Sequence, residues 1–67
     1  MNNDFEKLQK LLEHWKVHNL EHAENYKLWA KKMEILGKNE TAKLLFEVYT
    51  QSLKLDELFE RALKTTE

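Results

Sequence analysis

The chain has 67 residues, with 11 Lys or Arg against 12 Asp or Glu, so its formal net charge is -1. A chain this short forms one domain and is seldom stable alone without disulfides, a metal or a partner chain. It contains no Cys, which excludes disulfides and thiolate sites. Acidic and basic residues are interleaved along the chain, so we expect neither nucleic acid nor an anionic membrane surface as a partner.

The location of the protein is predicted from two further features. No uninterrupted apolar run approaches the roughly 20 residues that a membrane-spanning helix needs. The first residues, Met1 to Asp4, do not resemble a signal peptide. We therefore expect a cytoplasmic protein with no membrane association.

Helix-breaking residues occur at one place in the chain. There is no Pro, and the single Gly is Gly37, which suits the left-handed position just past a helix C-terminus. Asn3 followed by Glu6 resembles a capping box for a first helix, and Asn39 suits the N-cap of a second. The sequence therefore predicts two long helices joined by a short hinge.

The predicted fold class is all-α, an antiparallel two-helix hairpin, because a short hinge forces consecutive helices to lie antiparallel. The hairpin is expected to form a single domain over residues 1–67. Its expected parts are a first helix over about 4–36, a hinge at 37–39 and a second helix over about 40–64.

Apolar residues follow a three-four spacing in both helices, the heptad period typical of helices packed at shallow angles. The expected contact seam of the first helix is Phe5, Leu8, Leu12, Trp15, Asn19, His22, Tyr26, Trp29, Met33 and Leu36. The expected seam of the second helix is Ala42, Leu45, Tyr49, Ser52, Asp56, Phe59 and Leu63. With a hinge at this place, the residue numbers of two facing positions should add to about 78. His22 is therefore expected opposite Asp56.

Each helix also carries a second apolar stripe that a two-helix hairpin cannot bury. The stripes are Val17, Leu20, Leu28 and Ile35 on the first helix, and Leu44, Val48, Leu55, Leu58 and Ala62 on the second. Exposed apolar surface of this extent marks an interface. The simplest closure is a two-fold homodimer that forms a four-helix bundle; the alternative is a different helical protein that covers the same stripe.

Three histidines, His14, His18 and His22, are spaced by four residues and lie along one side of the first helix. A pair of His at i and i+4 is a familiar bidentate arrangement for Zn, Ni or Cu. The outer two are about 12 Å apart along the helix, so one ion needs a crossing partner to reach all three. The predicted divalent transition-metal ligands are His14, His18 and His22 with Asp56, which the expected register places opposite His22.

The alternative interpretation is structural. A His facing an Asp across a helical interface commonly fixes register and partner choice, as polar seam residues do in coiled coils. Asn19 and Ser52 suit the same role. His22 and Asp56 are therefore either a register-setting pair or part of a metal site.

Catalysis has little support in the sequence. There is no Gly-rich phosphate loop and no nucleophile arrangement of Ser or Thr with His and a carboxylate. The Glu-x-x-His motif of di-iron bundles is missing, because Leu11, Trp15 and Asn19 stand three residues before the histidines. We predict that the protein is not an enzyme.

The stretch His14-Trp15-x-x-His18-Asn19-x-Glu21-His22-Ala23, continued by Tyr26, Trp29 and Ala30, resembles a group of short, uncharacterised prokaryotic helical-hairpin proteins with an HW-x2-HN-x-EHA pattern. The resemblance implies the hairpin and draws attention to the histidines, but it implies no substrate. Two functions remain open: a non-enzymatic module that acts by self-association or protein interaction, and a Zn, Ni or Cu-binding protein that uses the histidine face.

Overall fold

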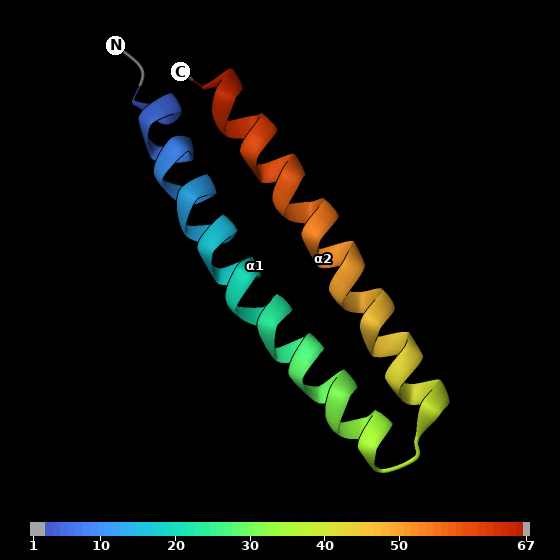
Figure 1. The fold of residues 1–67 in the computed structure, drawn as a ribbon. Helices are drawn as coiled ribbons and strands as arrows, with labels where there is room; N and C mark the ends of the chain where they lie inside the picture. The colour runs from blue at the N-terminus through green and yellow to red at the C-terminus, as the bar shows by residue number, and fades with distance from the viewer. Residues whose placement is uncertain (1–2, 67) are drawn as a thin grey trace.

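The computed structural model describes residues 3–66, which form two helices, α1 (Asp4–Ile35) and α2 (Asn39–Thr65). The helices lie side by side in antiparallel orientation, so that the start of α1 and the end of α2 are at the same end of the molecule (Figure 1). The Cα trace measures 57 × 14 × 11 Å. The predicted all-α hairpin is confirmed, and its helix ends differ from the expected ones by at most one residue.

The turn between the helices has the geometry of a Schellman motif. The Lys38 amide donates to the Met33 carbonyl at 2.9 Å, and the Gly37 amide donates to the Glu34 carbonyl at 3.1 Å. Gly37 has a φ of 79°, and a Cβ placed on it would meet no atom within 4 Å. Glycine is therefore favoured here by backbone conformation and not by lack of space, as the sequence predicted.

Of the two predicted N-caps, one is at the expected position and the other is not. Asn3 is the N-cap residue of α1 but makes no side-chain cap bond; its carbonyl accepts from the Lys7 amide at 3.0 Å. Lys38, not Asn39, is the residue before α2, and it too makes no side-chain cap bond. Since Lys38 completes the Schellman turn, Asn39 is already helical and cannot adopt the extended conformation of an N-cap.

The seam between the helices agrees with the prediction on α2 and differs on α1. On α2, Ala42 and Ser52 are buried as expected. On α1, Ala23 and Ala30 are 1% and 0% exposed, whereas Trp15 and Trp29 are 43% and 50% exposed. The observed α1 seam is Leu12, Lys16, Asn19, Ala23, Tyr26, Ala30 and Met33.

The physical reason for this difference is the size of the side chains. Alanine lets two helix backbones approach closely, while an indole in the same place would hold them apart. Every second position of the expected α1 seam has therefore moved by one residue, from Trp15 to Lys16, from His22 to Ala23 and from Trp29 to Ala30. The two tryptophans and His22 lie at the edge of the seam and face outward.

Three contacts fix the register. Lys16 Nζ lies 2.9 Å from Glu60 Oε2, and Lys27 Nζ lies 5.6 Å from the centre of the Tyr49 ring. The residue numbers add to 76 for these two pairs and to 71 for Asn19 with Ser52, against the expected 78. Asn19 Nδ2 donates to the Ser52 carbonyl at 2.8 Å, so the predicted role of Asn19 and Ser52 as seam polar residues is consistent with a direct contact between them.

The core of one hairpin is small. The buried residues among those described are Leu12, Ala23, Ala30, Ala42 and Ser52. No large side chain in residues 3–66 is fully buried. No helix in this range combines the length and hydropathy of a membrane span.

Candidate functional site

Large hydrophobic side chains are exposed along both helices. Within residues 3–66 they are Phe5, Leu8, Leu11, Trp15, Val17, Leu20, Leu28, Trp29, Ile35, Leu36, Leu44, Val48, Leu53, Leu55 and Leu58. Scattered exposed apolar residues are ordinary, but a contiguous patch marks an interaction site. The question is therefore which of these side chains share a face.

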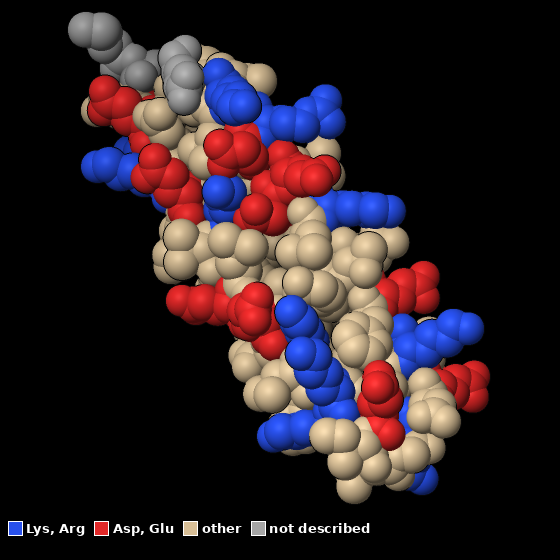
Figure 2. All heavy atoms as spheres, in the orientation of Figure 1, with Lys and Arg blue, Asp and Glu red and all other residues tan. Residues whose placement is uncertain are grey.

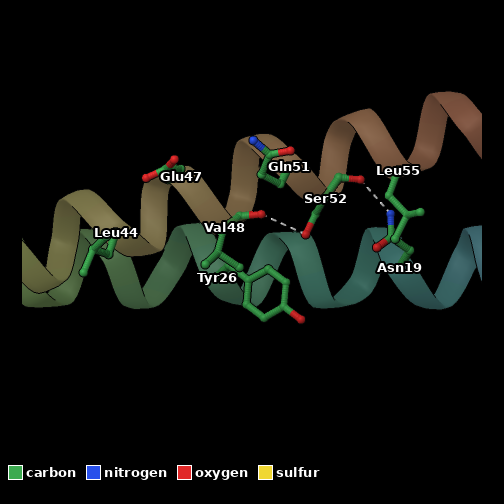
Figure 3. Close-up of a pocket in the computed structure, with 8 residues that line it drawn as sticks. All are labelled: Asn19, Tyr26, Leu44, Glu47, Val48, Gln51, Ser52 and Leu55. Carbon is green, nitrogen blue, oxygen red and sulfur yellow. Dashed lines mark hydrogen bonds between the residues drawn. The ribbon is translucent and has the colours of Figure 1, made fainter.

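A shallow groove shows which sides of the two helices belong together. It is lined by Asn19 and Tyr26 of α1 and by an α2 stripe that includes Leu44, Val48 and Leu55 (Figure 3). At its floor Asn19 donates to the Ser52 carbonyl, and the Ser52 hydroxyl donates to the Val48 carbonyl at 3.0 Å. The α2 stripe therefore opens on the same side of the hairpin as Tyr26.

The α1 residues on that side follow from the helical repeat of about 100° per residue. His22 lies four residues before Tyr26 and Trp29 three after it, so both lie within about 60° of Tyr26 around the helix. Continued along α1, the same stripe includes Trp15. We name the resulting surface the apolar face: Leu8, Leu11, Trp15, His18, His22, Tyr26, Trp29, Met33 and Leu36 on α1, and Leu44, Val48, Gln51, Leu55, Leu58 and Ala62 on α2.

The other side of the seam is polar. Lys16 pairs with Glu60 there; this contact raises the pKa of Lys16 and lowers the pKa of Glu60, mainly through the hydrogen bond and then through the opposite charges. Leu20 lies one turn after Lys16, so it belongs to this side. Figure 2 shows one face of the hairpin, on which acidic and basic side chains are interspersed along both helices with uncharged ones between them.

This arrangement corrects one prediction. The expected α1 stripe of Val17, Leu20, Leu28 and Ile35 does not share a face with the α2 stripe. The partner of the α2 stripe is the row that contains Trp15, His22 and Trp29, which the sequence had placed between the helices. The sequence did contain a signal for this arrangement. Leu12, Ala23, Ala30 and Met33 are themselves spaced with the heptad period of a seam, which leaves the tryptophan row free to lie outside it.

His18, His22 and Tyr26 form a stacked row on the apolar face, and His14 lies edge-on to the end of this row. The ring centres of His14 and His18 are 5.8 Å apart with an edge-on angle of 78°. His18 and His22 are 4.6 Å apart and within 16° of parallel, and the same angle relates His22 to Tyr26 at 6.2 Å. All three imidazoles are exposed, so His18 and His22 form an accessible pair of nitrogen ligands.

Asp56 does not join this row. Its side chain is half-buried in the seam, and its Oδ1 atom has no hydrogen-bond partner. Its charge contributes to the raised pKa of Lys16 on the polar side. Within residues 3–66 no group of three or more His, Cys, Asp or Glu side chains could hold a metal ion, so His14, His18, His22 and Asp56 do not form one site in a single chain.

Comparison with known proteins identifies a family but no activity. Searches of curated proteins and of solved structures gave no match. A family model described as "Domain of unknown function (DUF8180)" matches residues 8–66, which include both helices apart from the first turn of α1. The chain therefore belongs to this family of uncharacterised function.

Proposed function

We propose that the protein is a non-enzymatic helical module that acts by self-association through the apolar face and closes into a four-helix bundle. The observation that carries this proposal is the distribution of large side chains. The seam of one hairpin buries alanines and a serine, while Trp15, Trp29, Val48 and Leu55 remain at least 42% exposed on one face. Burial of such side chains is the main driving force for helix association in water.

A stable dimer needs only a modest share of the surface of the hairpin. A standard interface buries roughly 800 Å² on each partner, about a seventh of the 5555 Å² accessible surface of the hairpin. The apolar face runs along a molecule 57 Å long and contains large side chains from both helices. A second copy supplies the same surface, so both partners bury their apolar stripes in one step.

The charged groups on the polar side indicate that this side is not the one that associates. Lys16 and Glu60 form an ion pair there, and Lys27 lies near the Tyr49 ring. Burying such charged groups is costly unless each retains its partners. We therefore infer that this side stays in water while the apolar face associates.

A matched pair of substitutions on α2 tests the proposal. Leu55 lies on the apolar face and is 42% exposed, whereas Leu53 is 40% exposed and points away from it. Leu55→Glu should dissociate the dimer, because it places an unpaired charge in an apolar contact. Leu53→Glu should leave the mass unchanged in light scattering after size-exclusion chromatography.

Two results would overturn this account. One is a folded wild-type monomer at micromolar concentration, and the other is equal dissociation by both variants. A stable complex with a different helical protein on the same face, with no self-association, would favour the heterologous partner instead. Circular dichroism of each variant shows whether the hairpin itself remains helical.

A second candidate function is binding of Zn, Ni or Cu. The observation that favours it is the parallel stacking of His18 and His22 at 4.6 Å, since imidazole is a preferred ligand of these metals. Within residues 3–66 no third ligand joins this pair, so the candidate depends on a second chain.

A further inference from the structure

The hinge end of the molecule carries the most exposed large hydrophobic side chains of residues 3–66. Ile35 is 85% exposed and Leu36 is 68% exposed, more than any other large hydrophobic residue in this range. Both lie where α1 ends and the turn to α2 begins (Figure 1). Ile35 is outside the apolar face, so the proposed self-association leaves its side chain in water.

These two side chains belong to a continuous surface. Trp29, Lys32, Met33, Ile35 and Leu36 together line one shallow hollow beside the turn. Trp29 is 50% exposed, and the Lys32 ammonium group lies 4.3 Å from the centre of its ring. Aromatic and aliphatic surface is therefore joined to a cation at this end of the hairpin.

Basic residues are in excess at the hinge end. Residues 27–43 contain five of the eleven basic residues and two of the twelve acidic ones, a net charge of +3, whereas the whole chain has -1. The two acidic residues are Glu34 and Glu40. Lys31, Lys32 and Lys38 are exposed and lie within four residues of Ile35. The most exposed apolar side chains are thus surrounded by a local positive charge.

We propose that the hinge end docks on the surface of an anionic lipid bilayer. The docking surface, which we name the hinge patch, consists of Trp29, Lys31, Lys32, Ile35, Leu36 and Lys38. The apolar side chains enter the boundary between headgroups and acyl chains, and the lysines bind anionic headgroups. Tryptophan is enriched at the same depth of a bilayer.

The shape of this end favours lipid over a protein partner. The hinge patch lies at one extremity of a molecule 57 Å long, and uncharged side chains are visible there in Figure 2. A protein partner would need a cavity that matches this protruding end, whereas lipid headgroups rearrange around it. Apolar contact and positive charge occur together, which is the combination that reversible binding to anionic membranes requires.

This proposal revises the expectation of no anionic membrane partner. That expectation was based on the charge of the whole chain, in which acidic and basic residues are interleaved. The average conceals the difference between the hinge end, with a net charge of +3, and the remaining residues, with -4.

The test is flotation of the full-length protein with unilamellar vesicles of phosphatidylcholine, with and without phosphatidylglycerol. The protein should float with the anionic vesicles at low salt, bind pure phosphatidylcholine far less, and dissociate as salt is added. Ile35→Ser should weaken binding by about tenfold or more, because it removes a buried apolar side chain. Lys31→Gln combined with Lys38→Gln should weaken it by about tenfold or more through the loss of charge.

Each variant has a matched control at a distance from the hinge. Val17→Ser changes a side chain that is 57% exposed on the same helix, and Lys7→Gln combined with Lys10→Gln removes the same charge from the start of α1. Both controls should bind the anionic vesicles as the wild type does. Circular dichroism of each variant checks that the hairpin remains helical.

Three results would overturn the proposal. They are no binding of the wild type to anionic vesicles, equal loss of binding in the controls, and binding to an acidic protein with none to the vesicles. Self-association is tested separately, because Ile35→Ser lies outside the apolar face and should leave the mass in sedimentation equilibrium unchanged. Loss of vesicle binding with an unchanged mass would support the hinge patch as the docking surface.

Discussion

Ala30 is the least exposed residue described in the chain, at 0%. Its methyl group is enclosed in the seam between α1 and α2, so a larger side chain would push the helices apart. We predict that Ala30→Leu destabilises the protein by about 1–3 kcal/mol through overpacking. Urea unfolding followed by circular dichroism measures this change, with Lys31→Leu on the exposed surface as the control; equal stability of both variants would contradict the close approach.

Asp56 lies in the seam with a buried carboxylate oxygen that has no hydrogen-bond partner. An unsatisfied buried acceptor costs roughly 1–3 kcal/mol. We therefore predict that Asp56→Leu raises the free energy of unfolding by about 1 kcal/mol or more. Thermal or urea unfolding provides the measurement. Destabilisation would instead show that Asp56 has a partner, such as the metal or the His22 contact that the sequence suggested.

The ion pair between Lys16 and Glu60 links the two helices, and its pH dependence follows from the pKa shifts. The pKa of Glu60 is lowered by Lys16, so its contribution is present above the ordinary carboxyl range and is lost as the pH falls through the lowered value. The pKa of Lys16 is raised, so its contribution is present below the ordinary lysine range and is lost as the pH rises through the raised value.

We predict that Glu60→Gln lowers the melting temperature slightly at neutral pH, because exposed ion pairs contribute little. The difference from wild type should vanish in acid, where Glu60 is protonated in both folded and unfolded protein. Melting curves from pH 2 to 7 at low salt measure this. A difference that persists at the acid end would contradict a charge-based contribution, and Glu57→Gln, one turn from Arg61, is the control.

At the scale of the helices, much could be predicted from the sequence. Gly37 marks the turn because only its backbone conformation suits the Schellman motif. The α2 seam was predicted correctly, and its two buried positions, Ala42 and Ser52, have the small side chains that close helix packing requires. The predicted α1 seam was one residue off at Trp15 and Trp29. Both tryptophans are as apolar as Ala23 and Ala30, and the smaller residues occupy the seam only because the two helices pack closely.

The same shift explains what was missed in the candidate site. The predicted seam placed His22 opposite Asp56. In that position the two residues would form either a buried pair or part of a metal site within one chain. Once Ala23 takes the seam position, His22 turns outward and joins His18 on the exposed face. The three histidines were visible in the sequence, but the surface to which they belong depends on a packing distance that one helix does not encode.

The whole molecule is a narrow hairpin whose largest side chains lie outside its own core. A chain this small is seldom stable alone, and we propose that it buries its apolar face by self-association. Self-association through the apolar face is therefore the central claim.

Sedimentation equilibrium of metal-free protein at micromolar concentration tests this claim most directly, because it measures mass without assuming a shape. The account predicts twice the 8.1 kDa mass of the chain, with the helical circular dichroism signal decreasing on dilution as the dimer dissociates and loses its core. A species of 8.1 kDa that stays fully helical over the same dilution series would contradict it.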